Sequence, residues 1–242
     1  MQIKINNVNY KSLNNISFEI EDNKITGILS NNMDDLNNII DLFANNKYTG
    51  KIKYNLSKNK VGLVSIDNLH DMTYGTVSDF LNNNDIESEI YKMLDFDKTI
   101  INRELNTLSS TEKIKLLILK NINKDTIFIN GILEEIDSET KNIFTKLIIN
   151  LKKFYNKTII VSSIDIDNIY SFIDNLIIIH DSKCYSSNKY DIYNNEDILY
   201  NSFIQKPFIK EIENKILEKT NINLGNNENI NELIKAIYRE MR

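Results

Sequence analysis

Two adjacent aspartates, Asp34 and Asp35, stand at the start of a predicted helix, just behind a short apolar run. The run, residues 25–29, is predicted as a buried strand, and apolar periodicity predicts a helix that follows it to about Ala44. Strand, short turn and helix form the layout of a phosphate-binding loop, in which N–H groups at the helix start hold the anion. Such a loop relies on glycines and a lysine, and this turn contains neither.

A carboxylate at a helix start is itself stabilising. It satisfies free N–H groups and the positive end of the helix dipole, which as an N-cap is worth about 1 kcal/mol. We therefore expect Asp34 and Asp35 to cap their own helix, to stand where a phosphate would bind, and to repel a real one. This expectation is the same whether the segment is an ordinary helix cap or a phosphate loop that has lost its function.

Other residue types that support chemistry are scarce. His70 and His180 are too few and too far apart in sequence to suggest a metal cluster, and the single cysteine, Cys184, excludes an internal disulfide framework and a cysteine-based zinc site. We expect no metal site. The chain has 29 Lys and Arg against 34 Asp and Glu, for a net charge of −5, and the basic residues are scattered. This pattern argues against a nucleic-acid partner.

Alternating strand and helix patterns predict an α/β fold with a mostly parallel sheet. Strand patterns occupy residues 2–20 (two strands joined by a turn), 24–29, 50–56, 60–66, 125–131, 157–163, 175–181 and 183–187, the last two as a hairpin. Helix patterns occupy most of 76–121, then 138–154 and 165–173, and short helices surround Pro207 in the tail. The 242 residues, 41% of them hydrophobic, suit one large domain, or one domain with a small appendage.

Five segments in order resemble the ATP-binding subunits of ABC transporters. "VGLVSIDNLHDMTYGTV" resembles the Q-loop strand, "LNTLSSTEKIKLLILKNI" the signature helix, "DTIFINGILEEID" the Walker B strand and D-loop, "TIIVSSID" the switch-histidine strand, and "KPFIKEIENKI…NINELIKAI" the C-terminal extension of the energy-coupling-factor (cobalt and vitamin uptake) subgroup. The resemblance implies an ABC-type nucleotide-binding-domain fold: a RecA-like mostly parallel sheet, an antiparallel β subdomain and a helical signature subdomain. It places the ATPase-like domain at 1–202, its helical subdomain at about 67–122, and a C-terminal helical extension at 203–242.

The resemblance implies that the phosphate loop is degenerate. The family pattern G-x-x-x-x-G-K-[ST] falls on Ser30, Asn31, Asn32, Met33, Asp34, Asp35, Leu36 and Asn37, and Asn38 follows. Ser30 and Asp35 thus replace glycines that let backbone N–H groups wrap the phosphates. Leu36 replaces the lysine, and Asn37 replaces the hydroxyl that holds Mg²⁺.

The other catalytic positions are degenerate as well. The Q-loop glutamine position falls on Ile66, the Walker B aspartate and catalytic glutamate on Asn130 and Gly131, and the switch histidine on Ser163. Without a carboxylate at 131 there is no general base beside a γ-phosphate. We expect no catalytic residue and no cofactor in this chain's own half-site. Glu134 and Glu135, just beyond, are expected in a solvated turn rather than as substitutes.

Two family features remain. Ser109 keeps the signature serine in the run Ser109, Ser110, Thr111 and Glu112, and Asp137 keeps the D-loop aspartate. Subunits of the resembled family stack head to tail, so these residues could contact Mg-ATP at a composite site held by an intact partner. The competing interpretation is local, because S-x-x-E before an apolar helix is a capping box. Both interpretations stay open.

The resemblance and the missing residues leave three functions. The first is a non-hydrolysing subunit of an energy-coupling-factor-like ABC transporter, paired as a heterodimer with an active ATPase subunit and bound to a transmembrane partner. The second is a divergent but active ABC ATPase, and the third is a soluble ABC-derived regulator or scaffold. The chain lacks a signal peptide and any apolar run of about 18 residues, so we expect a cytoplasmic protein, held at the inner face of the membrane only through a partner.

Three further expectations concern surfaces. A groove beside residues 66–81 would contact the membrane partner, whereas most apolar residues of the helical subdomain are expected in its core: Phe80, Leu81, Tyr91, Met93, Leu94 and Phe96. Tyr10 is the only candidate for a base-stacking aromatic. The amphipathic C-terminal helices could pack against their own chain or against a partner's matching tail.

Overall fold

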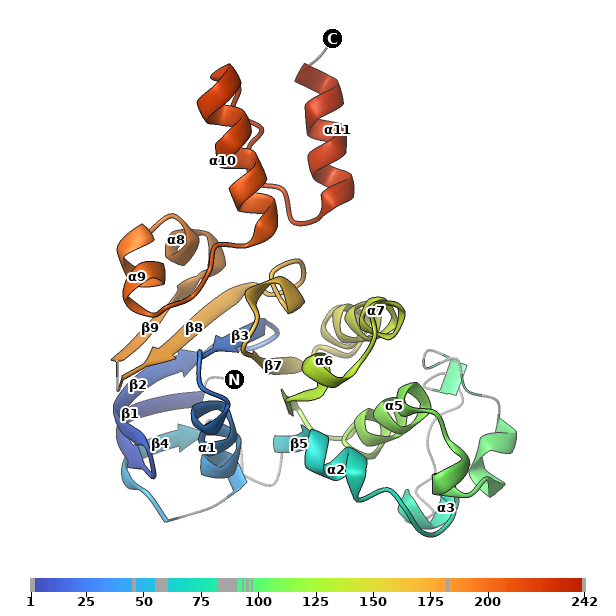
Figure 1. Ribbon diagram of the computed structural model, residues 1–242. Coiled ribbons are helices and arrows are strands. Elements are labelled where there is room, and N and C mark those ends of the chain that lie inside the picture. Colours follow the sequence, from blue (N-terminus) through green and yellow to red (C-terminus); the bar gives the residue numbers. More distant parts are fainter. Residues whose placement is uncertain are drawn as a thin grey trace.

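The computed structural model describes residues 3–44, 47–54, 61–81, 91, 92, 94, 96, 98–181 and 183–240 (Figure 1). A six-stranded sheet has the order β5-β6-β7-β3-β8-β9. Its strands are β3 (Ile25–Leu29), β5 (Val61–Ser65), β6 (Thr126–Asn130), β7 (Thr158–Ser163), β8 (Asn175–His180) and β9 (Lys183–Asn188). All neighbouring pairs are parallel except β8 and β9. The predicted parallel sheet and final hairpin are confirmed.

A second, antiparallel sheet has the order β2-β1-β4. Its strands are β1 (Ile3–Tyr10), β2 (Leu13–Ile20) and β4 (Thr49–Tyr54). Helix α1 (Met33–Ala44) lies between the two sheets, and its apolar side chains join Ile5 and Phe18 of one sheet to Phe128 and Ile177 of the other in a single core. Every residue of β3, β6 and β7 is buried, as expected for parallel strands covered on both faces.

Helices cover the other face of the central sheet. The principal ones are α5 (Ser110–Lys120) and α7 (Ser138–Tyr155), and short elements precede and separate them: α2 (Ile66–His70), α3 (Val77–Phe80), the 3₁₀ turns η2 (Lys98–Asn102) and η3 (Leu105–Thr107), and α6 (Ile132–Glu135). Of the apolar residues expected in this core, Leu81, Tyr91, Leu94 and Phe96 are buried, and Phe80 is partly buried. Met93 lies outside the described residues.

One predicted helix is wrong. Residues 165–173 form the single 3₁₀ turn η4 (Ile166–Asn168) followed by further turns. Asp165 closes the first turn by accepting a hydrogen bond from the Asp167 N–H, and the chain then delivers Asp174, whose carboxylate accepts from the Ile25 N–H of β3 (2.7 Å). The apolar spacing that suggested a helix reflects burial of successive turns.

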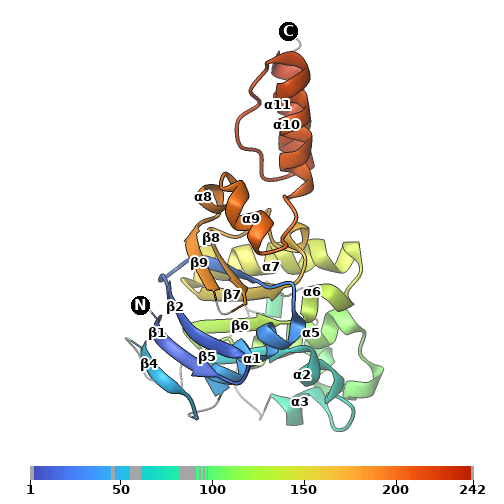
Figure 2. The ribbon, with the colours of Figure 1, turned by 60° about the vertical axis from the view of Figure 1, so that its left-hand side comes forward.

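The helices expected around Pro207 are present, and two further helices precede them. After β9 come α8 (Lys189–Tyr193) and α9 (Glu196–Asn201), and then α10 (Phe208–Thr220) and α11 (Ile230–Glu240). Helices α10 and α11 form a hairpin that projects from the body of the molecule in both views (Figures 1 and 2). Among the described residues, no helix is long and apolar enough to cross a membrane.

Candidate functional site

The candidate site lies at the carboxyl ends of β3, β6 and β7. Ligands of open α/β sheets bind at this edge, outside the strand ends. The three strands are adjacent, and Leu29 pairs with Ser163 and Asn130 with Ser162. The structure therefore brings together the loop that follows β3 and the degenerate positions that end β6 and β7.

The expected phosphate loop is largely helical. Helix α1 begins at Met33, so Met33 to Asn37 belong to the helix rather than to a loop. The cap is Asn32, whose Oδ1 accepts a hydrogen bond from the Asp34 N–H (2.9 Å), while its carbonyl accepts from the Asp35 N–H (3.2 Å). The expectation that an aspartate would be the N-cap is therefore wrong. Asparagine is a favoured N-cap residue, so Asn32 could have been found from the sequence.

The two aspartates occupy the first turn instead. Asp35 is half-buried, and its carboxylate accepts hydrogen bonds from the hydroxyls of Ser12 (2.7 Å) and Ser30 (3.4 Å). The Asn38 amide also donates to Ser12 (2.8 Å). Asp34 is exposed. Negative charge thus sits at the positive end of α1, where it is stabilised by the dipole without acting as the cap.

Leu36, at the position of the family's lysine, is fully buried in the core between the two sheets. Its side chain packs with Ile39 and Phe43 of the same helix. A side chain at this position therefore points into apolar surroundings rather than toward the sheet edge.

Asn37 and Asn130 contact each other. The Asn130 amide donates to Asn37 Oδ1 over 2.8 Å, and Asn130 Oδ1 accepts from the Ser162 hydroxyl. Asn130 is 2% exposed. This chain of neutral groups links α1, β6 and β7 at the positions where the resemblance places two Mg²⁺ ligands.

Gly131 and Ile66 also contact each other. Gly131 has a left-handed backbone, with φ of 71°, and is the N-cap of α6. A Cβ added there would lie 3.3 Å from Ile66 Cγ2. A glycine with a left-handed backbone thus stands at the position of the catalytic glutamate. The isoleucine beside it stands at the position of the Q-loop glutamine.

Glu134 reaches into the site, which corrects the expectation of a solvated turn. It is half-buried, and its Oε1 accepts from the Ser163 hydroxyl (2.6 Å) and the Ile164 N–H (3.1 Å). Among the described residues, the buried Oε2 has no hydrogen-bond partner. Glu135 is exposed, as expected. The sequence shows only that Glu134 follows the end of the predicted strand 125–131 by three residues. It does not show that α6 directs the Glu134 side chain toward β7.

His180 was also missed. It ends β8, and its Nδ1 lies 3.0 Å from Asn31 Oδ1. Its ring packs edge-on against that of Phe203. The site therefore has a second border, formed by the end of β8 and the segment after α9.

The signature segment has the predicted capping box. Ser109 Oγ accepts from the Glu112 N–H (3.2 Å), and Glu112 Oε2 accepts from the Ser109 N–H (2.8 Å). Arg103 donates to Glu112 Oε1 over 2.6 Å. Burial works against the charged Glu112, but the hydrogen bonds from Ser109 and Arg103 outweigh it and hold the pKa of this carboxyl below its usual value. Ser110 starts α5, and both serines are exposed.

Asp137 is the N-cap of α7. It accepts from the Thr140 N–H and the Glu139 N–H, each at 2.9 Å, and from the Thr140 hydroxyl. These hydrogen bonds, those from Thr140 foremost, lower the pKa of Asp137. Thr140 in turn lies 3.0 Å from the hydroxyl of Thr111. Thr111 of the signature segment is therefore linked to Asp137 through Thr140.

Tyr10 ends β1 and is half-buried. It lines a shallow hollow of about 360 Å³ together with Lys11, Lys47 and Tyr48. The Lys11 ammonium lies over the Tyr10 ring at 5.3 Å and also contacts Asp41 of α1 (2.5 Å). A local cation–π contact thus covers the one aromatic considered for base stacking.

No protein-family model matches the sequence, and no curated protein matches it. Several solved structures have a fold similar to that of this chain. One is a metal-chelate-type ABC transporter in an inward-facing conformation: 16% sequence identity, TM-score 0.69, with 83% of this chain and 88% of that chain covered. Another is CbiO1 from Clostridium perfringens, part of the ABC transporter complex CbiONQ: 16% identity, TM-score 0.70, with 90% and 95% covered. The chain thus has the α/β fold of ABC nucleotide-binding domains, as predicted, with a mostly parallel sheet and an antiparallel subdomain.

Proposed function

We propose that this chain is a non-hydrolysing cassette subunit of an ABC transporter, of the energy-coupling-factor type. It pairs with an intact ATPase subunit and a transmembrane partner, and couples the partner's ATP hydrolysis to transport. The observation that carries the proposal is the hydrogen bond between Asn130 and Asn37. The likeness to a subunit of the CbiONQ complex supports the transporter setting.

The amide pair is a poor site for Mg²⁺. Magnesium prefers carboxylates, phosphates and water as ligands, and neutral amides bring it no charge. The carbonyl oxygens of both amides are also engaged, Asn37 Oδ1 by Asn130 and Asn130 Oδ1 by Ser162. We therefore infer that this bridge holds α1 against β6 and β7 without a metal.

A triphosphate fits no better. The helix starts at Met33, so residues 30–32, between β3 and α1, form too short a connection to wrap the β-phosphate with N–H groups. A lysine at Leu36 would point into the core, and Asp34 and Asp35 bring negative charge to the helix start. Binding of Mg·ATP needs positive charge at this helix start, so this half-site does not support ATP hydrolysis.

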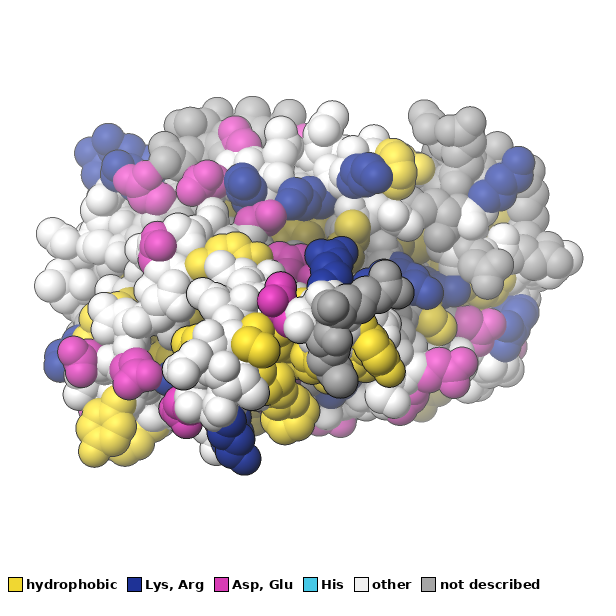
Figure 3. Space-filling view, turned by 90° about the horizontal axis from the view of Figure 1, so that it is seen from above, with side chains coloured by type: hydrophobic (Ala, Val, Ile, Leu, Met, Phe, Trp, Pro, Cys, Tyr) yellow, Lys and Arg dark blue, Asp and Glu magenta, His cyan; other side chains and the backbone are white. Residues whose placement is uncertain are grey.

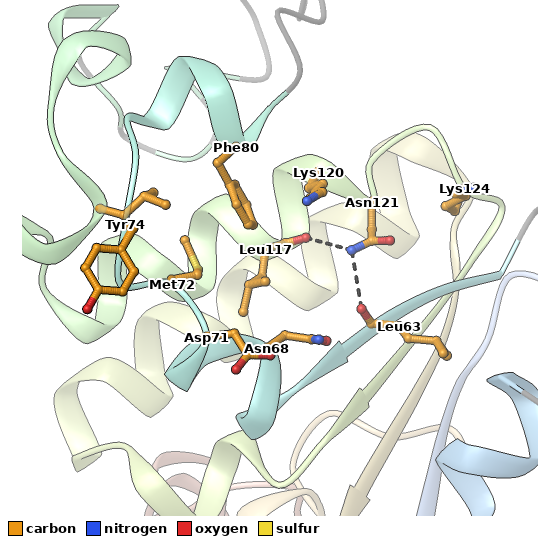
Figure 4. A pocket seen from close by; sticks show the side chains of 11 residues that line it. Leu63, Asn68, Asp71, Met72, Tyr74, Phe80, Leu117, Lys120, Asn121 and Lys124 are labelled. Carbon is orange, nitrogen blue, oxygen red and sulfur yellow. Dashed lines mark hydrogen bonds between the residues drawn. The ribbon is translucent and has the colours of Figure 1, made fainter.

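The surface for the transmembrane partner is a pocket of about 460 Å³ beside residues 66–81 (Figure 4). Tyr74, 90% exposed, stands at one side, and Phe80 lies beneath the Lys120 ammonium at 4.0 Å. Asn121 fixes the floor through hydrogen bonds to the carbonyls of Leu117 (2.9 Å) and Leu63 (3.5 Å). Tyrosine is enriched among the residues that carry most of the binding energy of protein interfaces, which favours Tyr74 as a contact of this partner.

Affinity purification from the native host tests the proposal. We expect an intact ABC ATPase and a polytopic membrane protein to co-purify, and the complex to hydrolyse ATP. The Ser109→Arg variant should lower that rate if Ser109 faces the partner's nucleotide. Asn106→Arg, which adds the same charge at an exposed position outside the capping box, is the matched control. Recovery of the chain without an ATPase, or turnover by the chain alone, would contradict the proposal.

A further inference from the structure

A polar pocket of about 310 Å³ lies beside the C-terminal helices. Residues 221–229, which join α10 to α11, return along α10 (Figures 1 and 2). The pocket lies between this segment, α10 and Asn194 at the end of α8. Its volume is at the lower end of the range for small-molecule sites, so it has room for one small ligand.

Two charged side chains that line the pocket are themselves buried. Lys210 and Glu213 of α10 are 8% and 7% exposed, and they form an ion pair at 2.6 Å. Glu213 Oε1 also accepts from the backbone N–H (2.9 Å) and the side-chain amide (2.7 Å) of Asn227. Both Glu213 oxygens are therefore engaged, and the buried pair is neutral as a unit. An ionic ligand would meet no unpaired charge to offset its own desolvation, so the pocket favours a neutral ligand.

The ion pair keeps hydrogen-bonding capacity for a ligand. A lysine ammonium has three N–H donors, and Lys210 directs one to Glu213 Oε2 and one to Asn226 Oδ1 (2.7 Å). No other acceptor among the described residues bonds to this ammonium. Because Asn226 accepts through its oxygen, its amide nitrogen remains a donor. One N–H of Lys210 and the amide N–H groups of Asn226 are thus left for a ligand.

Further asparagine amides form the rim of the pocket. Asn194 and Asn214 are exposed and line it together with Asn226. Each amide offers N–H donors and a carbonyl acceptor, and each hydroxyl of a polyol can both accept and donate a hydrogen bond. White surface, which is uncharged polar side chains and backbone, lies between charged side chains in the view from above (Figure 3). The lining therefore suits a ligand with several neighbouring hydroxyl groups.

The loop that carries Asn226 has a defined shape without a ligand. Gly225 has φ of 77°, a left-handed backbone that glycine adopts without strain, and its N–H donates to Asn223 Oδ1 (2.9 Å). The Asn227 side-chain amide also donates to the Leu224 carbonyl (3.1 Å). A preformed loop loses little conformational entropy when a ligand binds, which favours binding.

We propose that this pocket binds a small neutral polyol, such as a monosaccharide. The amides of Asn194, Asn214 and Asn226 exchange hydrogen bonds with its hydroxyl groups, Lys210 donates to one of them, and Leu217 contacts its C–H groups. A ligand held in this way joins the end of α8 to α10 and the loop after it, and so fixes the C-terminal helices against the body of the molecule. The inference does not depend on the proposed function.

Calorimetry and the side-chain amide NMR signals of the purified full-length chain test the pocket, with D-glucose as the probe. Because sugars also stabilise folded proteins by exclusion from their surface, an unfolding temperature would not be specific. We expect saturable binding at millimolar glucose and shifts of the Asn214 and Asn226 amide signals. The signals of Asn142, which is exposed on α7, should stay in place. Absence of saturable binding, or equal shifts at all three asparagines, would overturn the proposal.

Substitution at the rim tests the contacts. Asn214→Leu removes an amide donor and acceptor without adding charge, and it should weaken glucose binding about tenfold. Asn142→Leu is the matched control, because Asn142 is also exposed on a helix but lies outside the pocket. Both substitutions lie on exposed helical surface, so both variants should fold. Unchanged affinity in Asn214→Leu, or an equal loss in the two variants, would mean that the ligand does not bind at this rim.

A charged analogue tests whether the site takes a neutral ligand. D-glucuronate keeps the ring of glucose and carries a carboxylate in place of its terminal hydroxymethyl group. It should bind about tenfold more weakly than D-glucose, because Glu213 lines the pocket and desolvation of a carboxylate is costly. Glucuronate that binds as tightly as glucose would identify an anion site and overturn the proposed class of ligand.

Discussion

Asn130 donates a hydrogen bond to Asn37 across 2.8 Å and so joins the end of β6 to the second turn of α1. In the resembled family a charged metal and a triphosphate connect these elements. Here two neutral side chains of the chain itself connect them, and this connection needs no ligand.

Breaking this bridge should therefore lower stability whether or not nucleotide is present. Asn130→Ala removes the hydrogen-bond partner of Asn37 and one of the two acceptors of the Ser162 hydroxyl, which also donates to the Ile129 carbonyl, and it is expected to cost about 1–3 kcal/mol. A double-mutant cycle with Asn37→Ala should give a coupling of about 1 kcal/mol. Urea unfolding measures both quantities. Additive single variants would show that the bridge contributes nothing.

Repairing the lysine alone should fail. Leu36→Lys removes a fully buried apolar side chain and places a charge in the core, so we expect a loss of about 3 kcal/mol or more and no ATP turnover. Leu36→Met, which nearly conserves volume, should cost less than about 1.5 kcal/mol. Thermal unfolding and phosphate release are the measurements. Hydrolysis by a well-folded Leu36→Lys protein would contradict the buried orientation.

Restoring a side chain at Gly131 should also destabilise the chain. Both Gly131 and Gly225 have positive φ, but a Cβ at 131 meets Ile66, whereas a Cβ at 225 has open space around it. Gly225→Ala therefore measures backbone strain alone, about 1 kcal/mol. Gly131→Ala should cost more, and Ile66→Ala should relieve part of the difference. An equal loss of unfolding free energy in the two alanine variants would mean that Ile66 does not hinder a Cβ at position 131.

The capping box should make stability depend on acid pH. The pKa of Glu112 is lower in the folded chain than its usual value of 4.5, so its ionised form stabilises the fold above that pH. This stabilisation is lost as the pH falls through the lowered pKa. The stability advantage of the wild type over Glu112→Gln should thus be present at pH 7 and shrink below about 4.5. An advantage that is constant from pH 7 to pH 3 would contradict this role.

Much of the fold could be predicted because its signals are local. The buried strands are short apolar runs, and the Ser109–Glu112 capping box follows from residue types at fixed spacing. The helix predicted at 165–173 is wrong because that prediction also relied on local spacing. The apolar spacing of Ile166, Ile169 and Ile173 also suits a series of buried turns.

The site was predictable in its location but not in its contacts. Strand order brings residues 30, 130 and 163 together. No local sequence pattern, however, indicates the hydrogen bond between Asn37 and Asn130 or the one between Glu134 and Ser163. Both contacts join residues far apart in the sequence, and they depend on how helices dock on the sheet. The early start of α1 was missed because Asn32 was not considered as its cap.

The central claim is that the hydrogen bond between Asn130 and Asn37 replaces a bound nucleotide. Calorimetric titration of the purified chain with Mg·ATP tests this claim most directly. We predict no measurable binding at millimolar nucleotide, and no change in the unfolding temperature when nucleotide and Mg²⁺ are added together. Saturable, Mg²⁺-dependent binding with micromolar affinity would contradict a half-site closed by its own asparagines.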